Sequence, residues 1–250
     1  MDIYHEYASV YDVSGQLAFS LRMIPYLNLL LARHPVEQRV MIELACGTGT
    51  VAIAYADTDW RVYGVDGSAD MLAQARAKAS GHHAQVIWSQ QDMRSFIVPE
   101  RAGLVTCLYD SMNYMLKSDD LLAVFRRVYD ALLPGGLFLF DMNTVSAMVQ
   151  LWDDETYFSD SSDLAVIFQS QYDDRIQRTT VRVTCFQRTQ DALYRKIVEQ
   201  HTEQAYPREQ IATYLTDVGF QIEGQYDCPS FAEPTDDTHR IMWAARRVAT

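Results

Sequence analysis

Two glycines and two acids in the first third of the chain have the residue types and spacing of a nucleoside-binding site. The segment Glu43-Leu-Ala-Cys-Gly47-Thr-Gly49 predicts a tight turn between a strand and a helix, where the backbone can approach a ligand closely. The helix N-terminus that follows favours a carboxylate or a phosphate. Asp66 lies nineteen residues beyond Gly47, an interval typical of an acid that accepts hydrogen bonds from ribose hydroxyls. The pattern therefore predicts a site for an adenosine-containing cofactor.

The residues around this loop indicate which adenosine cofactor fits. No Gly-Lys-Ser/Thr sequence follows the loop, so a P-loop is excluded, and Ala52 stands where the dinucleotide fingerprint has its third glycine. Glu43 lies within the expected strand, and a buried carboxylate there repels a diphosphate but attracts an ammonium group. S-adenosylmethionine carries a ribose, an ammonium and a carboxylate but no phosphate, so it fits these residues best.

The elements that must position these residues alternate between short apolar runs and helical patterns. We expect strands at residues 39–45, 61–65, 86–89, 104–109 and 137–141, and helices at 17–33, after 50, at 68–79 and at 119–132. Such alternation predicts an α/β fold, a doubly wound and mostly parallel sheet with right-handed crossovers. In sheets of this kind ligands bind beyond the carboxyl ends of the strands.

The periodicity changes to two after residue 150, which is typical of antiparallel strands. Apolar and polar residues alternate in Leu164–Tyr172, Val181–Cys185 and Leu193–Glu203. We interpret residues 150–205 as an inserted antiparallel β-layer that serves as a lid, a substrate region or a dimer region. Residues 1–149 and 206–250 form the cofactor-binding core in this interpretation. Pro207 and Gly219 predict the start and the end of a last helix before two closing strands.

Four motifs stand in the order found in class I S-adenosylmethionine-dependent methyltransferases, which the chain resembles over about residues 5–145. They are Glu43-Leu-Ala-Cys-Gly-Thr-Gly49, Val65-Asp66-Gly-Ser, Gln91-Asp92-Met93 and Leu132-Leu-Pro-Gly-Gly136. Residues 7–12, 110–114 and 141–143 resemble the small-molecule branch that includes sugar-amine N,N-dimethyltransferases and glycine N-methyltransferase relatives. The resemblance implies a Rossmann-like methyltransferase fold, S-adenosylmethionine as cofactor and S-adenosylhomocysteine as product.

The resemblance also implies which residues bind the cofactor. Glu43 would lie near the ammonium, Asp66 on the ribose hydroxyls, Asp92 on the adenine amino group and Tyr11 near the methionyl carboxylate. The full set comes from the N-terminal segment, the glycine loop and the ends of three further strands: Tyr11, Glu43, Ala45, Gly47, Gly49, Asp66, Gly67, Met71, Asp92, Met93 and Leu108.

The acceptor side carries no strong signature of a catalytic group. Transfer from a sulfonium displaces an already activated methyl group, so orientation and exclusion of water supply most of the catalysis. His201 falls on the inserted layer, where an exposed position is favoured over one that faces the acceptor pocket, and Trp152 is expected as an apolar wall. The candidates for positioning the acceptor lie at strand ends or in the N-terminal segment: Tyr11, Tyr109, Asn113, Tyr114, Asp141 and Asn143.

The most favoured activity is methyl transfer to the amine nitrogen of a small molecule, since an acidic pocket attracts a cationic amine. The alternatives are an O-methyltransferase acting on a small metabolite and a catalytically silent module that binds the cofactor or a partner. A nicotinamide-dependent oxidoreductase is disfavoured by Glu43 and by the missing third glycine. Asp141 and Asn143 supply two oxygen ligands without a firm third, so no metal is expected.

Charge and cysteine usage limit the remaining partners. The chain has 250 residues and a net charge of −12, a sign that disfavours nucleic acid and anionic membrane surfaces. Its four scattered cysteines show no paired spacing, which favours a reducing cytoplasm. The N-terminus does not resemble a signal peptide. We expect a cytoplasmic monomer or homodimer that binds a small-molecule acceptor, with no nucleic-acid or membrane partner.

Overall fold

A seven-stranded sheet forms the centre of the computed structural model, which describes residues 3–82, 85–191 and 193–248. The strand order is β10-β11-β5-β4-β1-β2-β3, in which β1 to β5 are parallel and β11 is antiparallel to both of its neighbours, β5 and β10. The strands are β1 (Val40–Leu44), β2 (Arg61–Asp66), β3 (Val86–Gln90), β4 (Ala102–Cys107), β5 (Leu132–Asn143), β10 (Phe220–Asp227) and β11 (Arg240–Arg247). The sheet is the predicted doubly wound one.

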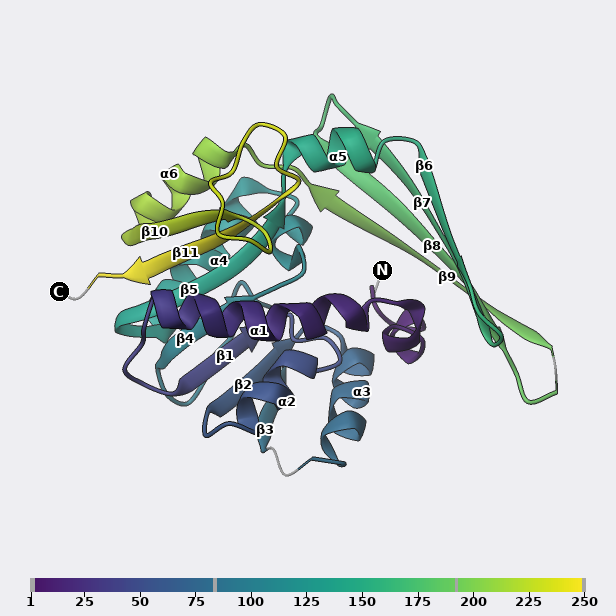
Figure 1. Cartoon of the computed structure of the whole chain (residues 1–250), viewed down its shortest axis with the longest axis horizontal. Coiled ribbons are helices and arrows are strands. Elements are labelled where there is room, and N and C mark those ends of the chain that lie inside the picture. The colour runs from purple at the N-terminus through teal and green to yellow at the C-terminus, as the bar shows by residue number, and fades with distance from the viewer. Residues whose placement is uncertain (1–2, 83–84, 192, 249–250) are drawn as a thin grey trace.

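Helices cover both faces of this sheet (Figure 1). Apolar side chains of α1 (Leu17–Arg33) and α2 (Thr50–Ala56) pack on one face, and those of α4 (Ser118–Ala131) and α6 (Arg208–Val218) pack on the other. Helix α3 (Ala69–Ala79) packs along β2 and β3. Residues of β5 alternate between the two cores, since Phe138 and Phe140 face α4 while Leu137 and Leu139 face α1.

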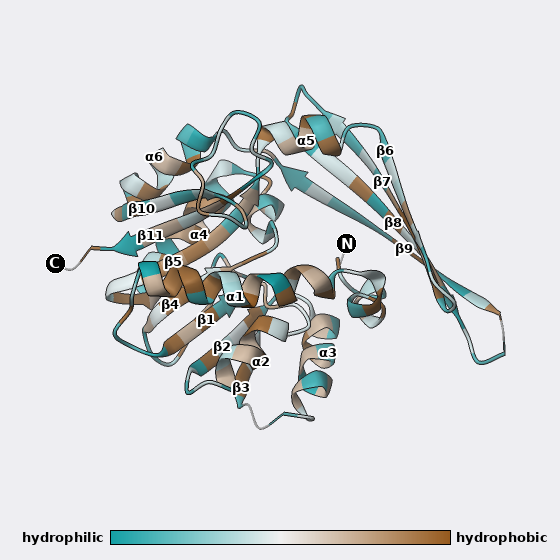
Figure 2. Cartoon of the chain, in the orientation of Figure 1, coloured by the Kyte–Doolittle hydropathy of each residue, from teal (hydrophilic) through white to brown (hydrophobic). Residues whose placement is uncertain are grey.

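A second sheet of four antiparallel strands lies beside the carboxyl edge of the first. It consists of β6 (Glu155–Asp160), β7 (Leu164–Asp173), β8 (Arg178–Arg188) and β9 (Tyr194–Gln204), in that order. Figure 1 shows it as a long arm that extends away from the body. Figure 2 shows that the central sheet is mainly hydrophobic, whereas the far end of the arm is largely hydrophilic. Only the near part of this sheet therefore has a core to pack against.

The N-terminal segment bridges the two sheets. Its short 3₁₀ helices η1 (Tyr7–Ser9) and η2 (Asp12–Ser14) lie between α3 and the four-stranded sheet. Tyr7 and Val10 pack against apolar residues of β7, β8 and β9. On the other side, Lys78 of α3 makes an ion pair with Asp12 at 2.7 Å between Nζ and Oδ2. The segment is thereby attached to both parts of the molecule.

The structure confirms the predicted α/β fold with an additional antiparallel layer, and it differs from the sequence-based expectation in detail. The helix expected at residues 17–33 is α1, which continues through Pro25 without a break, because the burial of Leu27 and Leu30 outweighs the loss of one backbone donor. Two elements that the periodicity did not predict are α5 (Val145–Leu151) and β6. Among the described residues no helix is long and apolar enough to span a membrane.

Candidate functional site

The glycine loop between β1 and α2 is held by the carboxylate of Asp66. Asp66 Oδ2 accepts a hydrogen bond from Gly47 N at 2.8 Å, and Oδ1 accepts one from Ser68 N at 2.7 Å. Gly47 has a φ of 52°, in the left-handed region that glycine adopts without strain. Burial raises the pKa of Asp66, and the backbone hydrogen bonds act against that rise. The carboxylate therefore fixes the turn on which the predicted cofactor site depends.

Gly49 serves a packing role instead of lining the site. It has a φ of 75°, and a Cβ added there would lie 2.4 Å from the ring of Trp88 and 3.0 Å from Ala75 Cβ. The glycine allows α2 to pack closely against β3 and α3. Gly49 does not line the cavity next to the loop, so its predicted contact with the cofactor stays a prediction.

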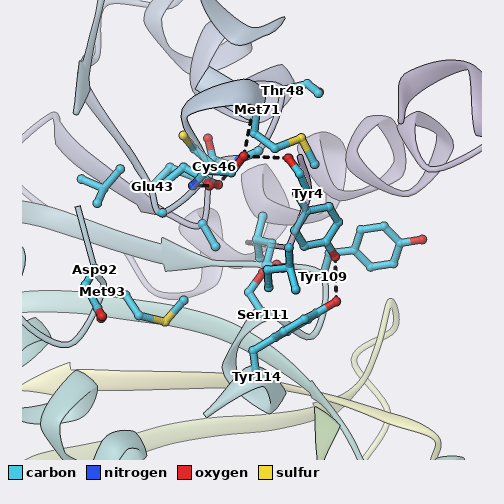
Figure 3. Close-up of a pocket in the computed structure, with 18 of the residues that line it drawn as sticks. Tyr4, Glu43, Cys46, Thr48, Met71, Asp92, Met93, Tyr109, Ser111 and Tyr114 are labelled. Atoms are coloured by element: carbon cyan, nitrogen blue, oxygen red, sulfur yellow. Dashed lines mark hydrogen bonds between the residues drawn. The ribbon is translucent and has the colours of Figure 1, made fainter. Parts of the chain in front are cut away.

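A cavity of about 1030 Å³ opens at the carboxyl ends of β1, β2 and β4. It is drawn in Figure 3, where Glu43, Met71, Asp92 and Met93 surround the space between the glycine loop and the opposite wall. Ten of the eleven predicted cofactor residues line it: Tyr11, Glu43, Ala45, Gly47, Asp66, Gly67, Met71, Asp92, Met93 and Leu108. The structure thus brings together residues from an N-terminal segment and from four separate strand ends.

Glu43 is the clearest indication of a ligand group. Its side chain is buried, and its Oε2 atom has no hydrogen-bond partner. Burial raises the pKa of this carboxyl to about 8. Because an unpartnered buried carboxyl is costly, the position favours a ligand that brings a cationic donor, such as an ammonium group. This observation fits S-adenosylmethionine.

Asp92 lines the same cavity but is already paired. Arg94 donates to both oxygens of Asp92, with Nε–Oδ1 at 2.9 Å, and also to Asp120 Oδ1 at 2.9 Å. These contacts lower the pKa of Asp92. Its predicted hydrogen bond to the adenine amino group therefore requires one carboxylate to serve both Arg94 and the base.

A second cavity of about 300 Å³ lies between the first cavity and the near end of the four-stranded sheet. Tyr4, Tyr11, Tyr109 and Tyr114 line both cavities and form the wall between them. The remaining aromatic residues of the smaller cavity are Tyr7, Trp152, Tyr157 and Phe168. The predicted apolar role of Trp152 fits this position.

Three carboxyl residues line the smaller cavity, the exposed Glu155 and two buried ones. Asp110 and Glu203 are both buried, and Asn143 Nδ2 donates to Asp110 Oδ2 at 2.7 Å and to Glu203 Oε2 at 3.1 Å. Burial, and secondarily the charge of Asp110, raise the pKa of Glu203 well above its usual range. None of the described residues that line this cavity is a lysine or an arginine.

Asp141, a predicted acceptor residue, is fully buried and supports a strained turn below the cavities. Tyr109 and Asp110 both have positive φ values, 61° and 52°, which are costly for residues with side chains. Asp141 accepts hydrogen bonds from Tyr109 N at 2.7 Å and Asp110 N at 3.1 Å, and it pairs with Arg240. It lines neither cavity.

Asn113 and Asn143 are likewise buried and line neither cavity. The Asn113 amide donates to Asn143 O at 3.1 Å and to Gln204 O at 2.9 Å, and its oxygen accepts from Asn143 N at 3.0 Å. These bonds join β5 to the end of β9. Of the predicted acceptor residues, Tyr11, Tyr109 and Tyr114 line the smaller cavity, while the two asparagines and Asp141 position their neighbours.

His201 is not at the favoured exposed position but at the alternative one, facing the smaller cavity. Its side chain is buried and lines the smaller cavity, together with Glu203 from the same strand. Glu199, His201 and Glu203 alternate along β9, and all three lie on its buried face. The period of two was a signal that these residues share a face. It did not show which face is covered, because the covering residues come from the N-terminal segment.

Comparisons with known proteins agree with the fold and with methyltransferase activity. Residues 41–136 match the family described as a methyltransferase domain. The chain is 28% identical over 251 residues to YqeM of Bacillus subtilis strain 168, whose name assigns it to the methyltransferases, with 99% of this chain and 98% of that protein covered. It is 30% identical to a dTDP-3-amino-3,6-dideoxy-alpha-D-glucopyranose N,N-dimethyltransferase of Streptomyces fradiae, covering 54% of this chain and 52% of that protein.

A solved structure of similar shape is an S-adenosylmethionine-dependent methyltransferase from Clostridium acetobutylicum ATCC 824. The TM-score is 0.88 at 25% identity, and the match covers 99% of this chain and all of that one. These matches agree with three features described above: the glycine loop, the unpartnered Oε2 atom of Glu43 and the strand order. The chain resembles class I S-adenosylmethionine-dependent methyltransferases in fold, and the matches support an S-adenosylmethionine-dependent methyltransferase enzyme.

Proposed function

We propose that the enzyme transfers the methyl group to an amine nitrogen of a small molecule held in the smaller cavity. The observation that carries this proposal is the pair of buried carboxyls, Asp110 and Glu203, in a cavity walled by aromatic rings and lacking lysine and arginine among its described lining residues. Aromatic faces and carboxylates both attract an ammonium group. Two relatives whose names describe sugar N,N-dimethyltransferases support the same acceptor chemistry.

In this proposal the larger cavity holds the methyl donor. Glu43 contacts the ammonium of its methionyl part, Asp66 the ribose hydroxyls, and Met71 packs near the adenine. S-adenosylmethionine supplies a methyl group that is already activated, so the chain's task is to align the acceptor with it. The four shared tyrosines separate the two cavities, exclude water and leave the acceptor nitrogen to approach from the smaller one.

The two acids recognise the cationic form of the acceptor in different ways. Asp110 is held in place by the Tyr109–Asp110 turn and lies 3.4 Å from the Arg240 guanidinium. Glu203 retains its proton in the empty cavity because burial disfavours its charge. A bound cationic amine stabilises the ionised form of Glu203. The amine and the Glu203 carboxylate therefore form a pair, and the cavity without the amine does not stabilise that carboxylate.

A matched acceptor screen tests this proposal. The full-length enzyme is incubated with S-adenosylmethionine and with pairs that differ only in the acceptor atom, such as benzylamine with benzyl alcohol and amino sugars with the parent sugars. Mass spectrometry then detects methylated products. We expect methylation of amines, and a raised KM for them in Glu203→Gln with little change in S-adenosylhomocysteine affinity. Methylation of the alcohols alone would establish oxygen as the acceptor atom.

A further inference from the structure

A chain of hydrogen bonds runs from the wall between the two cavities into the four-stranded sheet. Tyr4 Oη lies 2.7 Å from Tyr114 Oη, and Tyr114 Oη lies 3.2 Å from His201 Nδ1. Figure 3 shows Tyr4 and Tyr114 with their hydroxyl groups directed toward one another. The His201 ring also packs on the Tyr4 ring, with 4.6 Å between centroids. Three residues from distant parts of the sequence therefore form one connected group.

Glu199 fixes the far end of this chain. Its Oε2 accepts a hydrogen bond from Tyr4 N at 2.8 Å, and its Oε1 accepts one from Tyr7 N at 2.9 Å. The same Oε2 lies 3.6 Å from His201 Nε2, a buried nitrogen without a hydrogen-bond partner. A carboxylate at this position favours a proton on Nε2 and leaves Nδ1 as an acceptor. Tyr114 then donates to Nδ1, and Tyr4 donates to Tyr114.

This direction of donation leaves the lone pairs of Tyr4 Oη to accept a proton from a molecule at the boundary of the cavities. We propose that His201 is a positioning residue of the methyl transfer that takes up the acceptor's proton through the hydroxyl groups of Tyr114 and Tyr4. This inference rests on the proposed amine acceptor, because an amine that binds as a cation must lose a proton before its nitrogen can attack.

The proton step balances within the residues described. The acceptor N–H bond breaks, and its electron pair stays on nitrogen as the nucleophile. Tyr4 Oη gains that proton and passes its own to Tyr114 Oη, which passes its own to His201 Nδ1. Both phenols end unchanged, and the imidazolium lies beside Glu199. After methyl transfer the nitrogen carries the new methyl group as a cation, and His201 releases its proton to water when the product leaves.

Other titratable groups around the cavity are less suited to take this proton. Burial raises the pKa of Tyr4 and Tyr114, so these phenols keep their protons near neutral pH. Burial also raises the pKa of Glu203 in the empty cavity, and when the cationic amine binds, the ionised Glu203 serves as its counter-ion. Burial lowers the pKa of His201, while Glu199 and Asp110 act in the opposite direction. The imidazole that faces Tyr4, Tyr7 and Tyr114 is therefore neutral and able to accept at neutral pH.

The first test does not need an acceptor. Nitrogen-15 NMR of histidine-labelled protein saturated with S-adenosylhomocysteine reports the protonation of each ring nitrogen, and the His201→Gln spectrum assigns the signals. We expect neutral His201 with its proton on Nε2 at pH 7.5, and a shifted Nδ1 signal in Tyr114→Phe. A proton on Nδ1, or an imidazolium at this pH, would overturn the proposal.

The second test uses an amine that is methylated in the screen. We expect His201→Gln and Tyr114→Phe to lower kcat by roughly 10²-fold and to remove the acidic limb of the pH–rate profile, with unchanged affinity for S-adenosylhomocysteine. The control is His82→Gln, since His82 is exposed and contacts Asp57 on the surface. Wild-type rate and pH profile in His201→Gln would contradict the inference. If no amine is methylated, the amine proposal fails. The NMR result still decides whether the hydrogen bonds are donated from Tyr4 through Tyr114 to His201.

Discussion

The buried carboxyl of Glu43 destabilises the free protein when it is ionised, and it is also suited to bind an ammonium group of a ligand. Its carboxyl is buried with one oxygen unpartnered, an arrangement that destabilises the folded chain when the group is ionised. The same burial gives an ammonium group a strong partner, because few water molecules compete with it. In the proposed donor site, the residue would therefore link the protonation state of the free enzyme to binding of the methyl donor.

We expect binding of S-adenosylhomocysteine to release about one proton near pH 7. The pKa of Glu43 is raised to about 8, so the free protein holds a proton there that the ligand's ammonium expels. Affinity then rises with pH up to about 8. Calorimetry in buffers of different ionisation enthalpy measures the release. Glu43→Gln should bind more weakly and release no proton, whereas Glu37→Gln, at an exposed position, should resemble the wild type.

The stability of the free enzyme should change in the opposite sense. The folded pKa of Glu43 lies above the ordinary value of 4.5, so its stabilising protonation is lost as the pH rises through about 8. Above that pH, Glu43→Gln should unfold at a higher temperature than the wild type in the absence of ligand. Equal melting temperatures at pH 9 in a thermal-shift series would show that the carboxyl is not buried as described.

Asp141 illustrates a residue that acts through the backbone. Asp141→Asn removes the charge that pairs with Arg240 and one acceptor for the Tyr109–Asp110 turn. Breaking such a buried pair costs about 3 to 5 kcal/mol, so we expect a loss of that order in the free energy of unfolding measured with urea. Asp236→Asn, on an exposed loop, is the matched control. A variant as stable as this control would contradict the role of Asp141.

At the scale of elements, the sequence predicts those turns and strand ends that depend only on residues close together in the chain. The turn at Gly47 and its partner Asp66 follow from a motif that is short and bounded by clear strands. The direction of the Asp141 side chain does not follow, because it depends on the left-handed backbone of Tyr109 and Asp110. The burial of His201 was only the less favoured alternative for a similar reason, since residues of the N-terminal segment cover that face of β9.

Because α2 packs so closely against β3 at Gly49, we expect one added methyl group there to reduce both stability and cofactor binding. Gly49→Ala places a Cβ 2.4 Å from the Trp88 ring at a φ of 75°, so the glycine loop must shift. We expect a lower melting temperature and weaker binding of S-adenosylhomocysteine in calorimetry. Gly81→Ala is the control, because a Cβ there has only ordinary contact at 3.7 Å. Equal effects of the two substitutions would refute the packing argument.

The whole molecule carries a charge of −12. Glu43, Asp66 and Asp92 near the predicted cofactor site account for only part of it, so most of this charge lies elsewhere in the molecule. Self-repulsion among exposed carboxylates destabilises the compact state, and salt screens it over about 10 Å at 0.1 M. We therefore expect the melting temperature to rise by a few degrees (about 1 kcal/mol of stability) between low salt and 0.2 M NaCl. An equal rise in KCl identifies ionic strength as the cause, whereas a fall would show that ion pairs dominate.

The two cavities also differ in which segments of the chain supply their lining residues. The four-stranded sheet is one continuous stretch between Glu155 and Gln204. It supplies about half of the smaller cavity, whereas only Thr202 among its described residues lines the larger one. Under the proposed function, one exchange of the gene segment that encodes this stretch would alter the choice of acceptor and leave the residues of the larger cavity in place. Descendants of one ancestral enzyme can therefore diversify in substrate by recombination at two points.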